Sequence, residues 1–158
     1  MRLSELLTSD QVDVRHGPPK GPVIDGAEAL RILARMLASA GHVDLASVEH
    51  VLLEREKLQS TGIGEGVAIP HGALANLETQ HACLLVVPEG VDFAAIDGQR
   101  VTIFFAVIGP KRATGEHLKT LARVSRVLRN RAFREQLIAA SGPSDAYALI
   151  SAEELERR

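Results

Sequence analysis

The sequence predicts an α/β fold, a single-domain α/β sandwich in which a mixed β-sheet is flanked by helices. Stretches with apolar residues at helical spacing alternate along the chain with short apolar runs typical of buried strands. The pair Asp97-Gly98 precedes the last apolar run, as in a hairpin, so at least one strand pair should be antiparallel. The 158 residues, 46% of them hydrophobic, suit one domain with its own core. We expect this domain to cover residues 1–158, with its core at about 3–152.

The first elements follow from local signals. An N-terminal arm precedes a loop at 16–26 that holds three prolines and three glycines. Leucine and alanine recur at helical spacing over 27–39, and Gly41 is expected to end that helix. Asp44 then caps a second helix that runs to about Leu58.

Three apolar runs predict strands, and three further helices complete the chain. The strands cover 67–69, 83–87 and 101–108. The helices cover about 115–130, 132–140 and 144–151.

Composition excludes several function classes. The formal net charge of −2 gives no electrostatic reason to expect a nucleic-acid partner. No apolar stretch approaches the roughly 20 residues of a membrane-spanning helix, and no secretory signal is evident. We therefore expect a cytoplasmic protein without membrane insertion. The single cysteine, Cys83, excludes an internal disulfide and is predicted to be a buried, inert thiol. The histidines lack the spacing of paired metal ligands, so no metal is predicted.

Arg55 interrupts the apolar pattern of the second helix. Leu45, Val48 and Leu52 form one stripe, and Arg55 continues it near the helix end. Since a guanidinium keeps its charge in proteins, it needs a carboxylate or phosphate partner in this position. A snorkelling side chain, or a structural ion pair with Glu56 or with a residue of the sheet, would explain the feature as well.

His117 is a second polar residue on an apolar face. It shares one side of the long helix with Leu121, Val124 and Leu128. With Thr114 as the expected N-cap, His117 falls in the first turn, where free N–H groups and the helix dipole favour an anion. A histidine satisfied at the edge of the core would give the same pattern.

The segment 59–72 contains three alternating glycines that can bring the backbone close to a ligand: Gly62, Gly64 and Gly66. Their N–H groups can form an anion nest, to which Ser60 and Thr61 add hydroxyl donors. A tight entry into a strand explains the glycines as well. The spacing matches neither GxGxxG nor a P-loop, so no nucleotide site is predicted.

His71 follows this loop between a proline and a glycine. Pro70 fixes the backbone before it, and Gly72 is expected to let the chain turn away directly after it. We therefore expect the imidazole at the end of a short strand, held in a rigid frame.

Two runs of the chain resemble the type 2 IIA domains of the phosphoenolpyruvate-dependent phosphotransferase system. The active-site signature of that family is similar to LEREKLQSTGIGEGVAIPHG at 53–72. Its second-histidine helix is similar to EHLKTLARV at 116–124. The resemblance covers nearly the whole chain and implies one EIIA type 2 domain. Gln59 departs from the family's pattern, which has a glycine there.

The resemblance implies a phosphocarrier. His71 is then the phosphorylated residue, His117 its active-site partner, and Arg55 the cation that faces the phosphoryl group. With the 60–66 loop, these groups are expected to form a phosphate cradle. The donor would be the phosphohistidine of an HPr- or NPr-like carrier, and the recipient a downstream regulatory target or a IIB component. No cofactor is implied.

Three functional hypotheses remain open beside this one. Because no IIB, IIC or carrier segment accompanies the domain, the chain most resembles the stand-alone nitrogen-regulatory branch of the family. A sugar-specific IIA subunit for fructose or mannitol is one alternative. A purely binding regulatory module is another. A hydrolase that uses histidine and cysteine would require Cys83 to lie near His71.

Overall fold

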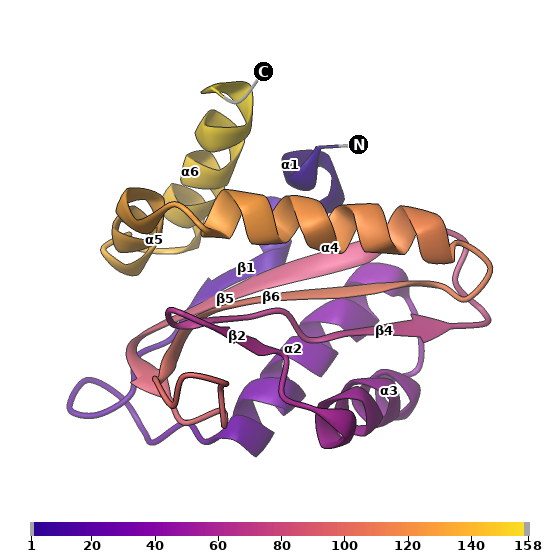
Figure 1. The fold of residues 1–158 in the computed structure, drawn as a ribbon, viewed down its shortest axis with the longest axis horizontal. Coiled ribbons are helices and arrows are strands. Elements are labelled where there is room, and N and C mark those ends of the chain that lie inside the picture. The colour runs from indigo at the N-terminus through magenta and orange to yellow at the C-terminus, as the bar shows by residue number, and fades with distance from the viewer. Residues whose placement is uncertain (1, 157–158) are drawn as a thin grey trace.

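The structure, a computed structural model, describes residues 2–156 and contains a six-stranded sheet with helices on both faces (Figure 1). The strands are β1 (Val12–Val14), β2 (Gly62–Gly64), β3 (Val67–Ala68), β4 (His71–Leu74), β5 (His81–Val91) and β6 (Val101–Pro110). The helices are α1 (Leu3–Leu6), α2 (Gly26–Gly41), α3 (Leu45–Leu58), α4 (Thr114–Leu128), α5 (Arg131–Ile138) and α6 (Pro143–Glu156), with a 3₁₀ turn at Ser9–Gln11. The predicted α/β sandwich is confirmed.

The sheet is mixed because its central strand, β6, has neighbours of both directions. β5 pairs antiparallel with one edge of β6, and β1 pairs parallel with β5. Two short parallel strands, β3 and then β4, share the other edge of β6. β2 pairs antiparallel with β3. The predicted antiparallel pair is therefore present, although the segment 92–100 joins its strands as a loop instead of a tight turn.

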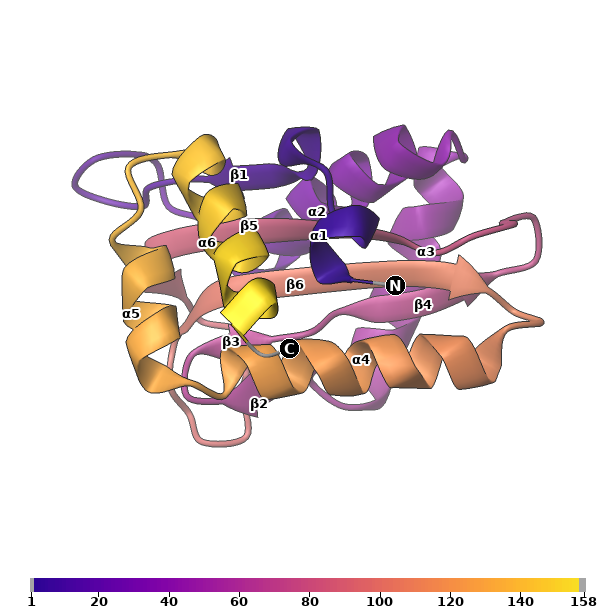
Figure 2. The ribbon, with the colours of Figure 1, turned by 90° about the horizontal axis from the view of Figure 1, so that it is seen from above.

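Side-chain alternation along the strands divides the core into two layers. One layer packs against α1, α4, α5 and α6, which cover one face of the sheet (Figure 2), and it takes Ile103, Phe105 and Val107 from β6. The other packs against α2 and α3 and takes Phe104, Ala106 and Ile108. All six side chains are buried, which explains why β6 reads as a continuous apolar run. Every second residue of a strand thus points toward α4, and this alternation positions the site.

The helix boundaries agree with the sequence at some ends and differ at others. The side chains of Asp25 and Asp44 each accept an N–H from the first turn of α2 and α3. α2 ends at Gly41 and is capped by His42, which adopts the left-handed conformation with φ of 51°.

The predicted N-cap of α4 is wrong. Ala113 occupies that position without a side-chain hydrogen bond, and the hydroxyl of Thr114 donates to the carbonyl of Lys111 instead. The N–H of His117 donates to the carbonyl of Ala113, so it is not available to an anion.

The sequence does not predict the short strands β1, β2 and β4, and the last of these changes the site. The chain does not turn away at Gly72 but continues along β6 to Leu74. Gly72 has a packing role, because a Cβ there would lie 2.9 Å from Cγ2 of Val51 on α3. Strands this short are not predicted, because they contain too few residues to show an alternation of apolar and polar side chains.

Candidate functional site

His71 stands at the start of β4 and meets a residue of α4. Ile69, two residues earlier, belongs to the core layer that faces α4, and His71 points to the same side. The ring centroids of His71 and His117 are 5.7 Å apart, with their planes tilted by 53°. The fold thus brings the two histidines of the sequence prediction together.

A backbone hydrogen bond fixes the imidazole of His71. Its Nδ1 lies 2.7 Å from the carbonyl oxygen of Ile69. Since a carbonyl oxygen only accepts, Nδ1 carries the proton and Nε2 keeps a free electron pair. The intervening Pro70 is anchored as well, because its carbonyl accepts the N–H of Val107 at 3.0 Å.

The surroundings of His71 favour its neutral form. Partial burial has the largest effect on the pKa of His71 and lowers it. The carbonyl of Ile69 raises this pKa, Arg55 lowers it and Glu56 raises it, and the net direction is downward. A neutral imidazole with a free Nε2 is a competent nucleophile at neutral pH.

His117 is buried beside His71, with only 9% of its surface exposed. Burial lowers the pKa of His117, and the adjacent His71 lowers it further. Its Nδ1 is buried and has no hydrogen-bond partner among the residues that the structure describes. The ring packs over Gly109, where a Cβ would lie 3.0 Å from Nδ1. A side chain at position 109 would therefore displace the imidazole.

Arg55 reaches the site from the last turn of α3. Its Nη1 donates to the carbonyl oxygen of Gln59 at 2.7 Å, and no carboxylate among the side chains that the structure describes pairs with the guanidinium. The alternative of an ion pair with Glu56 is wrong, because Glu56 binds Thr61. Gln59 is extended, with φ of −172°, so the glycine of the family's pattern is not needed there. The remaining N–H groups of Arg55 can serve an anion.

A pocket of about 310 Å³ adjoins His71. Four further residues of the sequence prediction line it: Arg55, Ser60, Thr61 and Gly62. Two exposed isoleucines, Ile63 and Ile96, form an apolar part of its wall, with 49% and 72% of their surface exposed. The pocket therefore combines a nucleophile, a cation and an apolar rim.

The predicted nest of free donors is not present in this loop. Thr61 donates its N–H and its hydroxyl to Glu56, at 2.8 and 2.6 Å. The hydroxyl of Ser60 donates to the carbonyl of Phe93, and the N–H of Gly62 donates to Oγ of Ser60 at 3.0 Å. These donors have internal partners, so Arg55 is the cationic group of the pocket lining that can face an anion beside His71.

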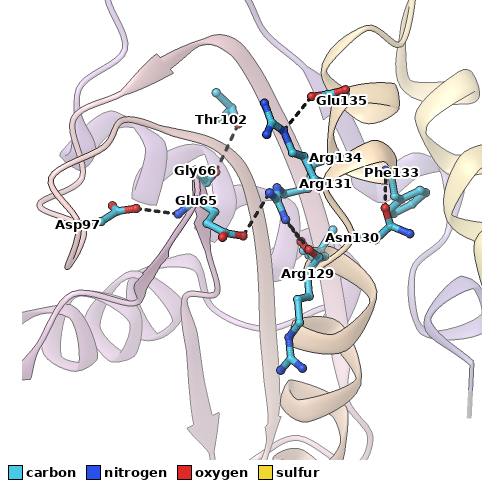
Figure 3. Close-up of polar contacts among 11 residues, drawn as sticks. Glu65, Gly66, Asp97, Thr102, Arg129, Asn130, Arg131, Phe133, Arg134 and Glu135 are labelled. Carbon is cyan, nitrogen blue, oxygen red and sulfur yellow. Dashed lines mark hydrogen bonds and ion pairs between the residues drawn. The ribbon is translucent and has the colours of Figure 1, made fainter.

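Gly64 and Gly66 do not line the pocket but form the turn between β2 and β3. Their φ angles of 98° and 81° favour glycine, so the alternative of a tight strand entry accounts for them. Glu65 between them also has a positive φ, of 57°. Its N–H donates to a carboxylate oxygen of Asp97 at 2.8 Å (Figure 3).

An ion pair joins this turn to Arg134 on α5, which in turn binds the end of α4. Oε2 of Glu65 lies 3.2 Å from Nη2 of Arg134, whose side chain is almost buried. Nη1 of Arg134 donates to the carbonyls of Leu128 and Arg129 (Figure 3). The contact supports the pocket wall that carries Ile63. No sequence pattern indicates it, because its partners are far apart in the chain.

Cys83 lies in the opposite core layer. Its thiol donates to the carbonyl of Leu33 on α2 at 3.8 Å, and burial raises the pKa of Cys83. The hydrolase hypothesis is therefore wrong, since Cys83 and His71 face opposite sides of the sheet. Among the described residues, no three metal-binding side chains gather, and no helix is long and apolar enough to cross a membrane.

Comparison with known proteins identifies the family. Residues 23–153 match the family model described as "Phosphoenolpyruvate-dependent sugar phosphotransferase system, EIIA 2". The chain belongs to this family. It is thus an EIIA type 2 protein with a phosphocarrier or regulatory role, which confirms the resemblance of the two sequence runs.

Several relatives of this EIIA type 2 protein are nitrogen regulatory proteins. The "Nitrogen regulatory protein" of Bradyrhizobium diazoefficiens is 37% identical over 124 residues, which are 78% of this chain and 81% of the relative. The crystal structure of "Nitrogen Regulatory Protein IIA-Ntr" from Neisseria meningitidis superposes with a TM-score of 0.83 and 30% identity, covering 94% of this chain and 98% of that one. The "PTS system fructose-specific EIIABC component" of Bacillus subtilis is 31% identical over 96% of this chain but only 23% of its own length.

Proposed function

We propose that His71 accepts a phosphoryl group from the phosphohistidine of an HPr- or NPr-like carrier, and that the phosphorylation state of this single domain regulates a downstream protein in the cytoplasm. One observation carries the proposal. The Nδ1 proton of His71 is held by the Ile69 carbonyl, so the free Nε2 is the atom that can attack phosphorus. The relatives named as nitrogen regulatory proteins support the regulatory role.

The transfer balances without a proton moving. A bond forms between Nε2 of His71 and phosphorus, while the bond between phosphorus and the carrier's imidazole nitrogen breaks. That nitrogen takes back the electron pair, and the carrier's ring, which keeps the proton on its other nitrogen throughout, leaves as a neutral imidazole. His71 keeps its Nδ1 proton, and the phosphorylated ring becomes a stronger donor to the carbonyl of Ile69.

The charge of the transferred group needs positive partners, because in phosphoryl transfer it spreads over three oxygens. Arg55 supplies fixed charge, since Gln59 holds one edge of its guanidinium and leaves other N–H groups unused. His117 lies close enough to His71 to contribute a second donor. Both residues flank the nucleophile from different helices, so the carrier's phosphoryl group would enter between them.

The carrier would dock on the apolar rim of the pocket. Ile63 and Ile96 are exposed large apolar residues beside His71, and such a small patch suits a transient encounter. The rim belongs to β2 and to the loop between β5 and β6. These segments are tied together by the contact between Glu65 and Asp97.

A sugar-specific IIA role is the second candidate. It is favoured by the relative named for fructose and by structural neighbours named for mannitol, one of them a complex with phosphorylated enzyme IIB. In that case the phosphoryl group would pass from His71 to a IIB partner. Transfer to a purified IIB, measured after His71 is charged, separates the two candidates.

Intact-mass analysis tests the proposed chemistry. The protein is incubated with phosphoenolpyruvate, enzyme I and an HPr-type carrier, beside the variants His71→Ala and His81→Ala. His81 is the matched control, because it is another partly buried histidine. We expect one acid-labile phosphate on the wild type and on His81→Ala, and none on His71→Ala. Phosphate retained by His71→Ala would reject His71 as the acceptor, and its absence from wild type beside a charged carrier would reject the function.

A further inference from the structure

Two buried polar atoms in this protein have no hydrogen-bond partner among the described residues: Oε1 of Gln80 and Nδ1 of His117. Gln80 is 7% exposed and His117 is 9% exposed. Buried polar atoms in native proteins nearly always have a partner, so each exception calls for a physical reason. One of these atoms belongs to the site described above, and the other to a residue that the site does not yet use.

The two side chains are neighbours over Gly109. A Cβ at position 109 would lie 3.0 Å from Nδ1 of His117 and 3.3 Å from Cγ of Gln80. The sheet explains this meeting, because Gly109 follows Val107 on the side of β6 that faces α4. Gln80 precedes β5, whose next residue on that same side is Ala82. Glycine at 109 leaves the space that both side chains share.

The orphan atoms are also chemically complementary. Nε2 of Gln80 donates to a carboxylate oxygen of Glu116 at 3.3 Å, which assigns the other end of the amide as the oxygen. That oxygen only accepts a hydrogen bond, and a protonated Nδ1 of His117 only donates one. The terminal torsion of a glutamine is broad, so Oε1 can turn toward the neighbouring ring.

From this juxtaposition we infer that Gln80 is a positioning residue for His117. Its Oε1 accepts a hydrogen bond from Nδ1–H, and this bond fixes the tautomer of the ring. The hydrogen bond of one ring nitrogen determines the state of the other. Nε2 of His117 has no hydrogen-bond partner among the side chains that the structure describes. It is then the position that gains a proton when an anion arrives. Burial keeps the pKa of His117 low before that event.

The consequence for phosphoryl transfer rests on the function proposed above. A phosphoryl group on His71 brings negative charge next to His117, and a proton from solvent then converts His117 into an imidazolium. Its Nε2–H donates to the phosphoryl group, while Nδ1–H stays on Gln80. Other charged groups lie near the two histidines and Gln80. Arg55 on α3 lowers the pKa of His71, and Glu56 raises it. On α4, Glu116 contacts Gln80, and Lys119 and Arg123 line the same pocket as these two residues.

Imidazole ¹⁵N chemical shifts of the full-length protein test the inference without any transfer chemistry. In unphosphorylated wild type at neutral pH, we expect Nδ1 of His117 to carry the proton. In Gln80→Leu, the ring should become a mixture of tautomers, and Gln80→Glu, which keeps an acceptor oxygen, should restore Nδ1–H. A proton on Nε2 in the wild type would overturn the inference, and this result needs no variant to fold.

A control variant, Glu116→Gln, separates the effect of the Gln80 oxygen on the His117 tautomer from the effect of the charge of Glu116. Glu116→Gln keeps an acceptor for the Gln80 amide, so the tautomer should not change. If Glu116→Gln alone shifted the tautomer as Gln80→Leu does, the inference would fail. Phosphoryl transfer to Gln80→Leu should slow by about fivefold, the effect of one neutral hydrogen bond, and an unchanged rate would contradict the role in transfer. If wild type accepted no phosphate, the proposed function would fail while the nitrogen shifts still decided the tautomer.

Discussion

Removing the carboxylate of Glu56 should destabilise the segment that carries the active site. Oε2 and Oε1 of Glu56 accept the N–H and the hydroxyl of Thr61, at 2.8 and 2.6 Å. Thr61 is buried, with 4% of its surface exposed. These two hydrogen bonds tie the last turn of α3, which holds Arg55, to the strand entry that follows it.

The magnitude follows from the two donors that would lose their partner. A buried donor left unsatisfied costs about 1–3 kcal/mol. Because the hydroxyl can rotate toward another acceptor and the N–H cannot, we expect Glu56→Ala to lower the free energy of unfolding by about 2–4 kcal/mol. Glu56→Gln keeps one acceptor oxygen and should lose about half as much.

Urea unfolding at pH 7 measures the free energy of unfolding of each variant. Far-UV circular dichroism is the readout, because the chain has no tryptophan. Glu54→Ala is the control, since Glu54 makes only an exposed ion pair with Lys57 on the same helix. Its effect should stay within about 0.5 kcal/mol. A loss below about 1 kcal/mol for Glu56→Ala, or a loss equal to that of the control, would refute the reasoning.

The remaining predictions concern the cation, the ion pair and the histidines. Arg55→Gln should slow phosphoryl transfer by about 100-fold in an intact-mass time course with little change in unfolding free energy, and a normal rate would remove Arg55 from the site. Arg134→Leu should lower the free energy of unfolding in urea by about 2–3 kcal/mol, because two carbonyls at the end of α4 lose their donor. Arg131→Ala is the exposed control and should lower it by less than about 0.5 kcal/mol. Burial lowers the pKa of His71 and of His117 below 6.5, so the unfolded chain binds more protons between those lowered values and about pH 6.5. The stability that these histidines contribute is complete above about pH 6.5 and is lost as the pH falls through their folded pKa values. The urea midpoint of the wild type should therefore decrease across that range. The double variant with glutamine at both positions should show a smaller decrease of the midpoint.

Much of the fold is readable from the chain because its signals are local. Helices α2 and α4 carry apolar stripes whose period spans only a few residues, and α2 and α3 begin at an aspartate cap. The stripe predicted for α3 is confirmed only for Val48 and Leu52, because Leu45 is exposed. Strands β5 and β6 are buried on both faces and read as apolar runs. The strands with three or four residues give no such signal, and β4 among them carries His71.

The candidate site divides in the same way. The sequence by itself indicated the candidate residues, since His71, His117 and Arg55 stand where apolar residues or ordinary loops would be expected. Only the tertiary structure decided what each polar group binds. The pairing of β4 with β6 sets His71 beside His117, and the register of β5 against β6 brings Gln80 to Gly109. The donors of Thr61 and Ser60 go to Glu56 and Phe93 instead of an anion. The physical reason is that helical period and capping depend on near neighbours in the chain, whereas the partner of a buried polar atom depends on strand register and on helices that are distant in sequence.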